Sequence, residues 1–311
     1  MAPVKSGRRS AAYIRSRVGY WPYLVPGVLL FIAVIVVPFA MNLYFSFTSW
    51  RGIGEPEWIG LENYLELASD STFWISFRNS IAMVVAIVVI PTAIGLLLAA
   101  TFFDFIGRRF GPRVASVLRA LYYLPQVVPV VAAGLLWTWI LQPQTGGLNT
   151  VLRAVGLDSL ALNWLGDPET ALPTVMSVLV WFQIGYPIVV FMAALERVDP
   201  ELYEAAEMDG APWFTRMRAI TIPQIRPEIF VVTLTGTISA LQVFAPIYVL
   251  TGGGPENSTN VPSYFSYTSF FTRAQVGYGA AIATVLALVV LLVALVMIRF
   301  QARSEKEDSE L

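Results

Sequence analysis

Six long apolar stretches, separated by charged or glycine-rich segments, constrain this chain more than any other feature of its sequence. They cover about residues 21–47, 80–103, 120–141, 171–195, 228–250 and 277–298. A helix of about 20 apolar residues crosses the hydrocarbon core of a bilayer, so each stretch is long enough to span it. The composition, 56% hydrophobic and 13% charged over 311 residues, also fits a polytopic membrane protein. The predicted fold class is all-α, with six transmembrane helices over residues 21–300.

The distribution of Lys and Arg predicts which helix ends face the cytoplasm. Six spans place both termini on one side of the membrane. Sixteen of the twenty Lys and Arg residues fall on that side, and four fall on the other: Arg51, Arg78, Arg153 and Arg273. Positive charge accumulates in cytoplasmic segments. We therefore expect a multi-pass protein of the cytoplasmic membrane, with cytoplasmic tails over residues 1–20 and 301–311.

The segment between the fourth and fifth spans, residues 199–223, is predicted to form a helix-turn-helix on the cytoplasmic side. Asp199 can cap a helix that begins at Pro200, and the acidic residues of the first turn suit the helix dipole. Gly210 can end that helix in a left-handed conformation, and Pro212 can begin a second short helix. We interpret this 199–223 loop as a docking element. A solvated amphipathic connector is the alternative that these residues leave open.

The same loop resembles the EAA loop of permease subunits in binding-protein-dependent ABC importers. The matching residues are Glu204, Ala205, Ala206, Asp209, Gly210, Ile220 and Pro223. Ile222 stands where Leu is commoner in the family. In that family the first helix of the loop sits in a groove of the ATP-hydrolysing subunit and transmits its movement. The resemblance implies a type I importer permease fold and a coupling role for the matching residues.

Three further stretches resemble the carbohydrate branch of that family, specifically the maltose-type first permease of a heterodimeric pair. They are Tyr23–Pro26 leading through Pro38 to Ser46–Phe47, then Leu250–Pro255, and Val276–Ala281. The resemblance implies a second homologous permease and two ATPase subunits, which bind the ATP and magnesium. It also implies a solute-binding protein outside the membrane, which would meet the glycine-rich outer segments. No cofactor is expected in this chain.

Uncharged polar side chains within the spans are candidates for contact with a substrate. They are Gln126, Gln183, Tyr186, Ser239 and Gln242. As a set they suit a neutral polyhydroxylated ligand, although each could instead make hydrogen bonds between helices. Pro125 and Pro129 place two kinks around Gln126, which is the most site-like pattern. The family's pocket matches residues 126–130, 185–188 and 239–243, and so adds Val130, Gly185, Ile188 and Val243. Ala240 and Val243 stand where some relatives have amides, which leaves the sugar open.

Residue types that the chain lacks argue against other mechanisms. The chain has no His and no Cys, and no charged residue lies in the middle of a span. These absences argue against a metal site, a membrane-embedded enzyme and a proton-driven carrier. No Gly-x-x-x-x-Gly-Lys-Ser/Thr sequence is present, so the chain is not expected to hydrolyse ATP. A net charge of −1 gives no indication of nucleic-acid binding. An ion-coupled carrier, or an importer of glycerol 3-phosphate, stays an alternative to sugar import.

Overall fold

The computed structural model describes residues 21–107 and 111–310, and no strand occurs within these ranges. One isolated antiparallel bridge joins Thr48 to Trp58. The predicted all-α class is therefore confirmed. The predicted tail over residues 1–20 lies outside the described residues, and residues 301–310 continue the last helix.

Four of the predicted spans are helices that are long and apolar enough to cross a membrane. They are Tyr23–Phe45, Ser71–Asp104, Pro168–Leu195 and Val276–Arg303. The first contains α2 (Trp21–Phe31), η1 (Ile32–Val36) and α3 (Val37–Phe45); the second contains α5 (Ser71–Val84), η2 (Val85–Val89), α6 (Ile90–Thr101) and η3 (Phe102–Gly107). The others are α11 (Pro168–Gln183) with α12 (Gly185–Leu195), and α19 (Val276–Glu310). The second span starts earlier than predicted, because Asp70 caps it by accepting a hydrogen bond from the Thr72 amide at 2.7 Å.

The third and fifth predicted spans need correction. In the third, α8 (Pro112–Val127) and α9 (Val130–Ile140) meet at 91°. Pro129 has no amide to donate at this break, and α9 turns aside to pack on α17 (Ala245–Leu250). In the fifth, α16 (Arg226–Leu241) has only 16 residues, or about 24 Å, before the break that precedes α17. The described residues thus hold four spanning helices, or five if the bent pair counts as one, and the count of six stays a prediction.

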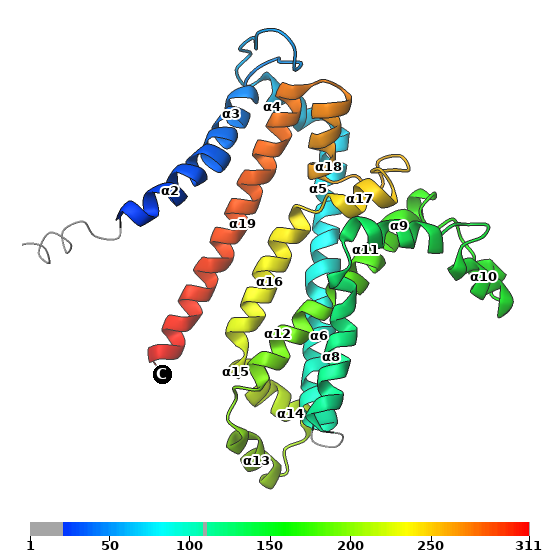
Figure 1. Cartoon of the computed structure of the whole chain (residues 1–311), viewed down its shortest axis with the longest axis vertical. Helices are drawn as coiled ribbons and strands as arrows, with labels where there is room; N and C mark the ends of the chain where they lie inside the picture. The colour runs from blue at the N-terminus through cyan, green and yellow to red at the C-terminus, as the bar shows by residue number, and fades with distance from the viewer. Residues whose placement is uncertain (1–20, 108–110, 311) are drawn as a thin grey trace, which may run out of the picture.

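Short helices occupy the two ends of the molecule and one side arm (Figure 1). One end carries α13 (Pro200–Met208) and α14 (Trp213–Arg216), followed by η5 (Met217–Thr221) and α15 (Ile222–Gln224). The opposite end carries α4 (Glu62–Ser69), α18 (Pro262–Tyr267) and η6 (Thr268–Thr272), and α10 (Gly147–Ala154) with η4 (Asp158–Leu160) lies to the side. The second and fourth spans lead toward the α13 end, and α8 and α16 lead away from it, as expected for a chain that crosses back and forth.

A packed core near the α13 end lies between α6, α8, α12 and α16. One buried cluster there includes Ile188, Phe191, Leu195, Tyr203 and Val232. Gly95 lets α6 approach α12 closely, because a Cβ atom at that position would lie 2.5 Å from the Cβ of Pro187. This core holds the α13 end of the molecule against the spans.

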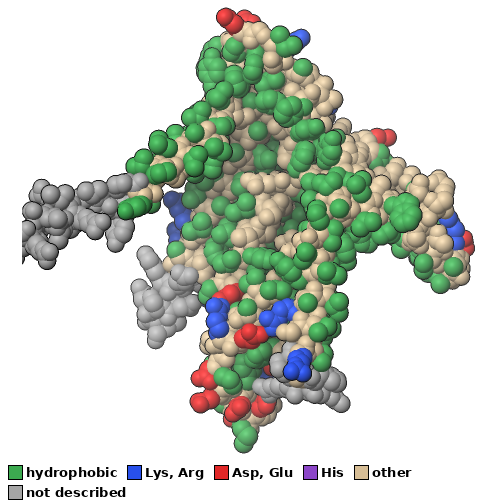
Figure 2. Space-filling model, in the orientation of Figure 1, with side chains coloured by type: hydrophobic (Ala, Val, Ile, Leu, Met, Phe, Trp, Pro, Cys, Tyr) green, Lys and Arg blue, Asp and Glu red, His purple; other side chains and the backbone are tan. Residues whose placement is uncertain are grey.

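The first span stands apart from this core. None of its apolar window is buried within the chain. The side-chain amide of Asn42 donates to the Ala280 carbonyl at 3.3 Å and to Thr284 Oγ1 at 3.0 Å, which joins α3 to α19. Toward its beginning the span diverges from α19, and its hydrophobic side chains cover it on the visible face (Figures 1 and 2). Most of its surface must therefore meet lipid or another subunit.

Residues 251–261, here called the glycine-rich loop, lie between α17 and α18 and are fastened to the second span. The side-chain amide of Asn79 is fully buried and donates to the carbonyls of Ser258 and Asn260, both at 2.9 Å. Within the loop, the hydroxyls of Thr251 and Thr259 lie 2.7 Å apart. The loop therefore forms part of the folded body, with its tip at Glu256 and Asn257 exposed.

Candidate functional site

The first helix of the 199–223 loop begins and ends as its sequence predicts. The Asp199 carboxylate accepts a hydrogen bond from the Glu201 amide at 3.0 Å, and Pro200 is the first helical residue. At the other end Gly210 has a φ of +72°, the left-handed conformation that glycine adopts without strain. The chain then turns through Pro212 into α14. Local capping alone therefore sets the limits of α13.

The inner face of α13 is held by Tyr203. This side chain is 1% exposed, and its hydroxyl lies 3.0 Å from Oγ1 of Thr221 in η5. Its ring centre lies 6.0 Å from that of Phe103, near the end of the second span. Tyr203 thus joins α13 both to the second half of its own loop and to a transmembrane helix.

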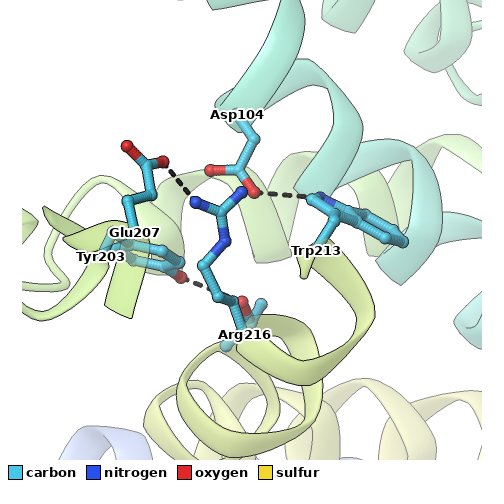
Figure 3. A network of polar contacts seen from close by, with 6 residues as sticks. Asp104, Tyr203, Glu207, Trp213 and Arg216 are labelled. Atoms are coloured by element: carbon cyan, nitrogen blue, oxygen red, sulfur yellow. Dashed lines mark hydrogen bonds and ion pairs between the residues drawn. The ribbon is translucent and has the colours of Figure 1, made fainter. Parts of the chain in front are cut away.

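Polar contacts reinforce this attachment (Figure 3). Arg216 of α14 forms an ion pair with Glu207 of α13, and the Arg216 side chain is only 12% exposed. The indole of Trp213 donates to Oδ2 of Asp104 at 3.0 Å, which connects α14 to η3. Figure 3 shows the Arg216 guanidinium lying between the carboxylates of Glu207 and Asp104. We call these residues, with Tyr203 and Thr221, the loop network.

The loop network was not predicted from the sequence. Asp104 is distant in sequence from the loop that it contacts, and no local pattern predicts that contact. The available signal was an acidic residue at the end of an apolar span, together with basic and Trp side chains in the second half of the 199–223 loop, after its acidic first helix.

The outer face of α13 is acidic around an apolar centre. Glu204, Ala205 and Met208 lie on one helical face and are exposed, with Met208 88% exposed. Five acidic residues and no basic residue lie between Asp199 and Gly210. Acidic side chains accordingly gather at this end in Figure 2. Such a face suits a partner with basic residues around an apolar depression.

The predicted coupling residues divide between this face and the packing beneath it. Glu204, Ala205, Asp209, Gly210 and Pro223 are exposed, and Ala206 is half-buried. Ile220 packs against the buried cluster that contains Tyr203. The coupling role of the set stays a prediction, with Ile220 placed to support the loop and the exposed residues placed to meet a partner.

The predicted substrate residues Gln126 and Gln183 meet where two helices are interrupted. The side-chain amide of Gln126 donates to Oε1 of Gln183 at 3.2 Å. Gln126 lies just before the break between α8 and α9, and Gln183 lies just before the junction of α11 with α12. Interrupted helices leave backbone groups free to face a cavity, which is why transporters place ligand sites there.

An apolar pocket of about 330 Å³ adjoins this glutamine pair. Its lining residues are Leu121, Tyr122, Pro125, Trp181 and Ile184. Trp181 is 41% exposed and packs edge-on against Trp137, with ring centres 5.4 Å apart. Tyr122 and Trp181 were not predicted as site residues, although they lie close in sequence to Gln126 and Gln183 at the two helix breaks. The amide groups can form hydrogen bonds with a hydroxylated ligand, and the neighbouring aromatic rings can pack against its apolar faces.

The other predicted substrate residues lie elsewhere. Ile188 is fully buried, Val243 is 8% exposed, and a Cβ atom on Gly185 would lie 2.3 Å from the Tyr122 carbonyl oxygen. These three therefore pack helices together in this conformation. Tyr186 and Val130 are half-buried, and Ser239 and Gln242 are exposed at the end of α16. Substrate contact by any of them stays a prediction. Among the described residues, no group of three or more His, Cys, Asp or Glu could hold a metal ion.

Comparisons with known proteins agree on one family. Residues 92–307 match the model of the family described as binding-protein-dependent transport system inner membrane component. A probable ABC transporter permease protein of Bacillus subtilis, YurN, is 36% identical over 92% of this chain and 96% of the relative. The diacetylchitobiose uptake system permease protein NgcF of Streptomyces coelicolor is 35% identical over 85% of this chain and 77% of its own. A crystal structure of a bacterial ABC transporter involved in alginate import superposes with a TM-score of 0.82 at 24% identity, over 94% of this chain and 98% of the other.

Proposed function

This chain belongs to the family of binding-protein-dependent transport system inner membrane components, and from that membership we propose a specific role. It is the permease subunit of an ATP-driven importer that moves a sugar or related polyol inward by alternating access. The observation that carries the proposal is α13, a capped helix held from behind by the loop network, with an acidic face turned outward. ATP hydrolysis belongs to partner ATPase subunits, and this chain supplies the path.

Sugar is the substrate class that the chemistry of the path supports. The relative NgcF is named for diacetylchitobiose uptake. The glutamine pair, Gln126 with Gln183, offers hydrogen bonds without charge, and Trp181 and Tyr122 offer aromatic surface. Within the described part of the chain no charged residue lines the pocket beside the pair, so a neutral ligand fits better than glycerol 3-phosphate.

Coupling follows from how the loop is attached. Closure of an ATPase dimer on binding ATP would move α13 through its exposed face. Tyr203 and Trp213 contact Phe103 and Asp104, so the movement would reach the end of the second span as well as α12 and α16. The spans would then rock to open the path to the other side.

The remaining partners match surfaces that this chain leaves uncovered. The first span, with none of its apolar window buried, supports pairing with a second permease. The exposed tip of the glycine-rich loop, at the end opposite α13, is available to a solute-binding protein. In the orientation we propose, both ends of the chain and α13 face the cytoplasm, as the positions of Lys and Arg predict.

The test is uptake and ATPase activity of the purified complex carrying Gly210→Leu. Gly156→Leu is the matched control, because both glycines have positive φ and open space around the missing Cβ atom. The cost of the left-handed conformation, about 1–2 kcal/mol, is therefore similar in both variants. We expect Gly210→Leu to lose ATPase co-purification and uptake while the control keeps both. Normal uptake by Gly210→Leu, or equal losses in both variants, would overturn the docking role.

A further inference from the structure

A second groove lies far from both candidate sites, between α4, α5 and α19. It has a volume of about 580 Å³. Phe73, Phe77 and Ile81 of α5 line it at intervals of four residues, opposite Val285 and Val289 of α19. Eight residues of helix correspond to about 12 Å, so the groove follows the helix axis over more than two turns. Its length and apolar walls suit an alkyl chain.

Among the described residues, one charged side chain lines this groove. Arg78 is exposed and has no hydrogen bond or ion pair with any residue in the described part of the chain. It belongs to the helix Ser71–Asp104, which meets the length and hydropathy requirements for crossing a membrane. A charged group on such a helix is costly unless it finds a partner or reaches the headgroup region. The described residues provide no such partner, so Arg78 must reach the headgroup region, where an anionic lipid group can pair with it.

Contacts between helices indicate the depth of Arg78. The hydroxyl of Tyr278 in α19 donates to Asp70, the cap of α5, at 2.6 Å. These two residues therefore lie at the same depth. Arg78 lies eight residues farther along, about 12 Å, which brings it level with Val285. Asn42, at the end of the apolar run of the first span, bonds to Thr284 at the same level. Because 25 uncharged residues then separate Arg78 from Asp104, Arg78 lies near one headgroup boundary and Asp104 near the other.

We propose that Arg78 and this groove bind one anionic phospholipid in the leaflet opposite the 199–223 loop, which is the outer leaflet in the orientation proposed above. The phosphate accepts hydrogen bonds from the Arg78 guanidinium, a geometry to which Arg is suited. One acyl chain extends along Ile81, Val285 and Val289. Tyr64 and Trp74, also in the lining, are aromatic residues of the kind that gather at headgroup level.

Native mass spectrometry of the complex from nanodiscs tests this site. The discs contain phosphatidylglycerol and phosphatidylcholine in equal amounts, and the lipid that stays bound is counted by headgroup. We expect bound phosphatidylglycerol to fall about fivefold in Arg78→Gln, the loss of one cation beside a lipid phosphate. Arg51→Gln is the control, because Arg51 is exposed toward the same end of the molecule but does not line the groove. Retention of phosphatidylglycerol by Arg78→Gln at the control level would overturn the proposal.

Two further variants test the acyl chain and the occupant. Ile81→Trp narrows the groove where the acyl chain would lie without altering charge, and we expect it to release the same lipid as Arg78→Gln. A photoreactive benzoylphenylalanine at Trp74 should crosslink to phospholipid. Crosslinking to a partner permease would instead show that a protein segment occupies the groove, and would overturn the lipid assignment. Because this experiment counts lipid directly, a negative result would not bear on the transport proposal, which the Gly210→Leu variant tests separately.

Discussion

The glycine-rich loop and the 199–223 loop are attached to the spans in opposite ways. Asn79 holds the glycine-rich loop from within the body, and Val261 at its end is fully buried. The 199–223 loop exposes most of α13 and contacts the second span through a few side chains, chiefly Tyr203 against Phe103 and Trp213 bonded to Asp104. One loop is thus integral to the fold, whereas the other can move with whatever binds its outer face. The difference indicates that the glycine-rich loop is fixed relative to the spans, whereas the 199–223 loop is the part that a bound partner can move.

The largest expected effect is on the glycine-rich loop. Asn79→Leu removes two 2.9 Å hydrogen bonds and leaves the carbonyls of Ser258 and Asn260 without this donor. We expect a loss of about 3 kcal/mol in stability, because each buried unsatisfied group costs about 1–3 kcal/mol. Thermal unfolding of the solubilised complex measures it. Glu256→Gln, at the exposed tip, should change stability by less than about 0.5 kcal/mol. Equal unfolding temperatures for the two variants would contradict the claim that Asn79 fastens the glycine-rich loop to the body.

A smaller loss is expected from Tyr203→Phe, which removes the hydroxyl that pairs with Thr221 but keeps the buried ring. We expect about 1 kcal/mol, the usual net value of one hydrogen bond. The ratio of substrate imported to ATP hydrolysed should also fall, because α13 is then less firmly attached to η5. An unchanged transport ratio together with reduced stability would show that the bond is structural only.

The ion pair between α13 and α14 should contribute less. Glu207→Gln keeps the side-chain shape but removes the charge that pairs with Arg216. Since the Glu207 side chain is 42% exposed, we expect a loss of only about 0.5 kcal/mol. Raising the salt concentration should reduce the difference between this variant and the natural chain. A difference that salt does not change would mean that the pair is not acting through its charge.

The smallest effect on stability, with a large effect on assembly, is expected from Met208→Asp. Met208 makes little contact within the chain. The unfolding temperature of the variant should therefore equal that of the natural chain within the error of the measurement. Co-purification of ATPase should nevertheless fall, because the substitution places another negative charge at the apolar centre of the acidic face. Retained ATPase would mean that the outer face of α13 is not the docking surface.

The sequence predicted local features of this fold better than its long-range ones. The cap at Asp199 and the left-handed Gly210 depend on neighbouring residues, so their pattern was sufficient. Pro129 predicted a kink, yet the 91° turn depends on the packing of α9 against α17, which no local pattern contains. Likewise, the Gln126–Gln183 pair was visible only as two isolated amides until the folded chain brought them together.

The isolation of the first span has a consequence for the supply of this protein in the cell. A chain made without its partner displays an apolar span of 23 residues, joined to the body near one end through Asn42. Surface of this kind is what membrane proteases and insertion chaperones recognise in orphan subunits. If the proposed second permease covers this span, we expect the half-life of the chain, measured by pulse-chase labelling, to follow the amount of that partner. Surplus copies would then be removed, and subunit stoichiometry would be set after synthesis.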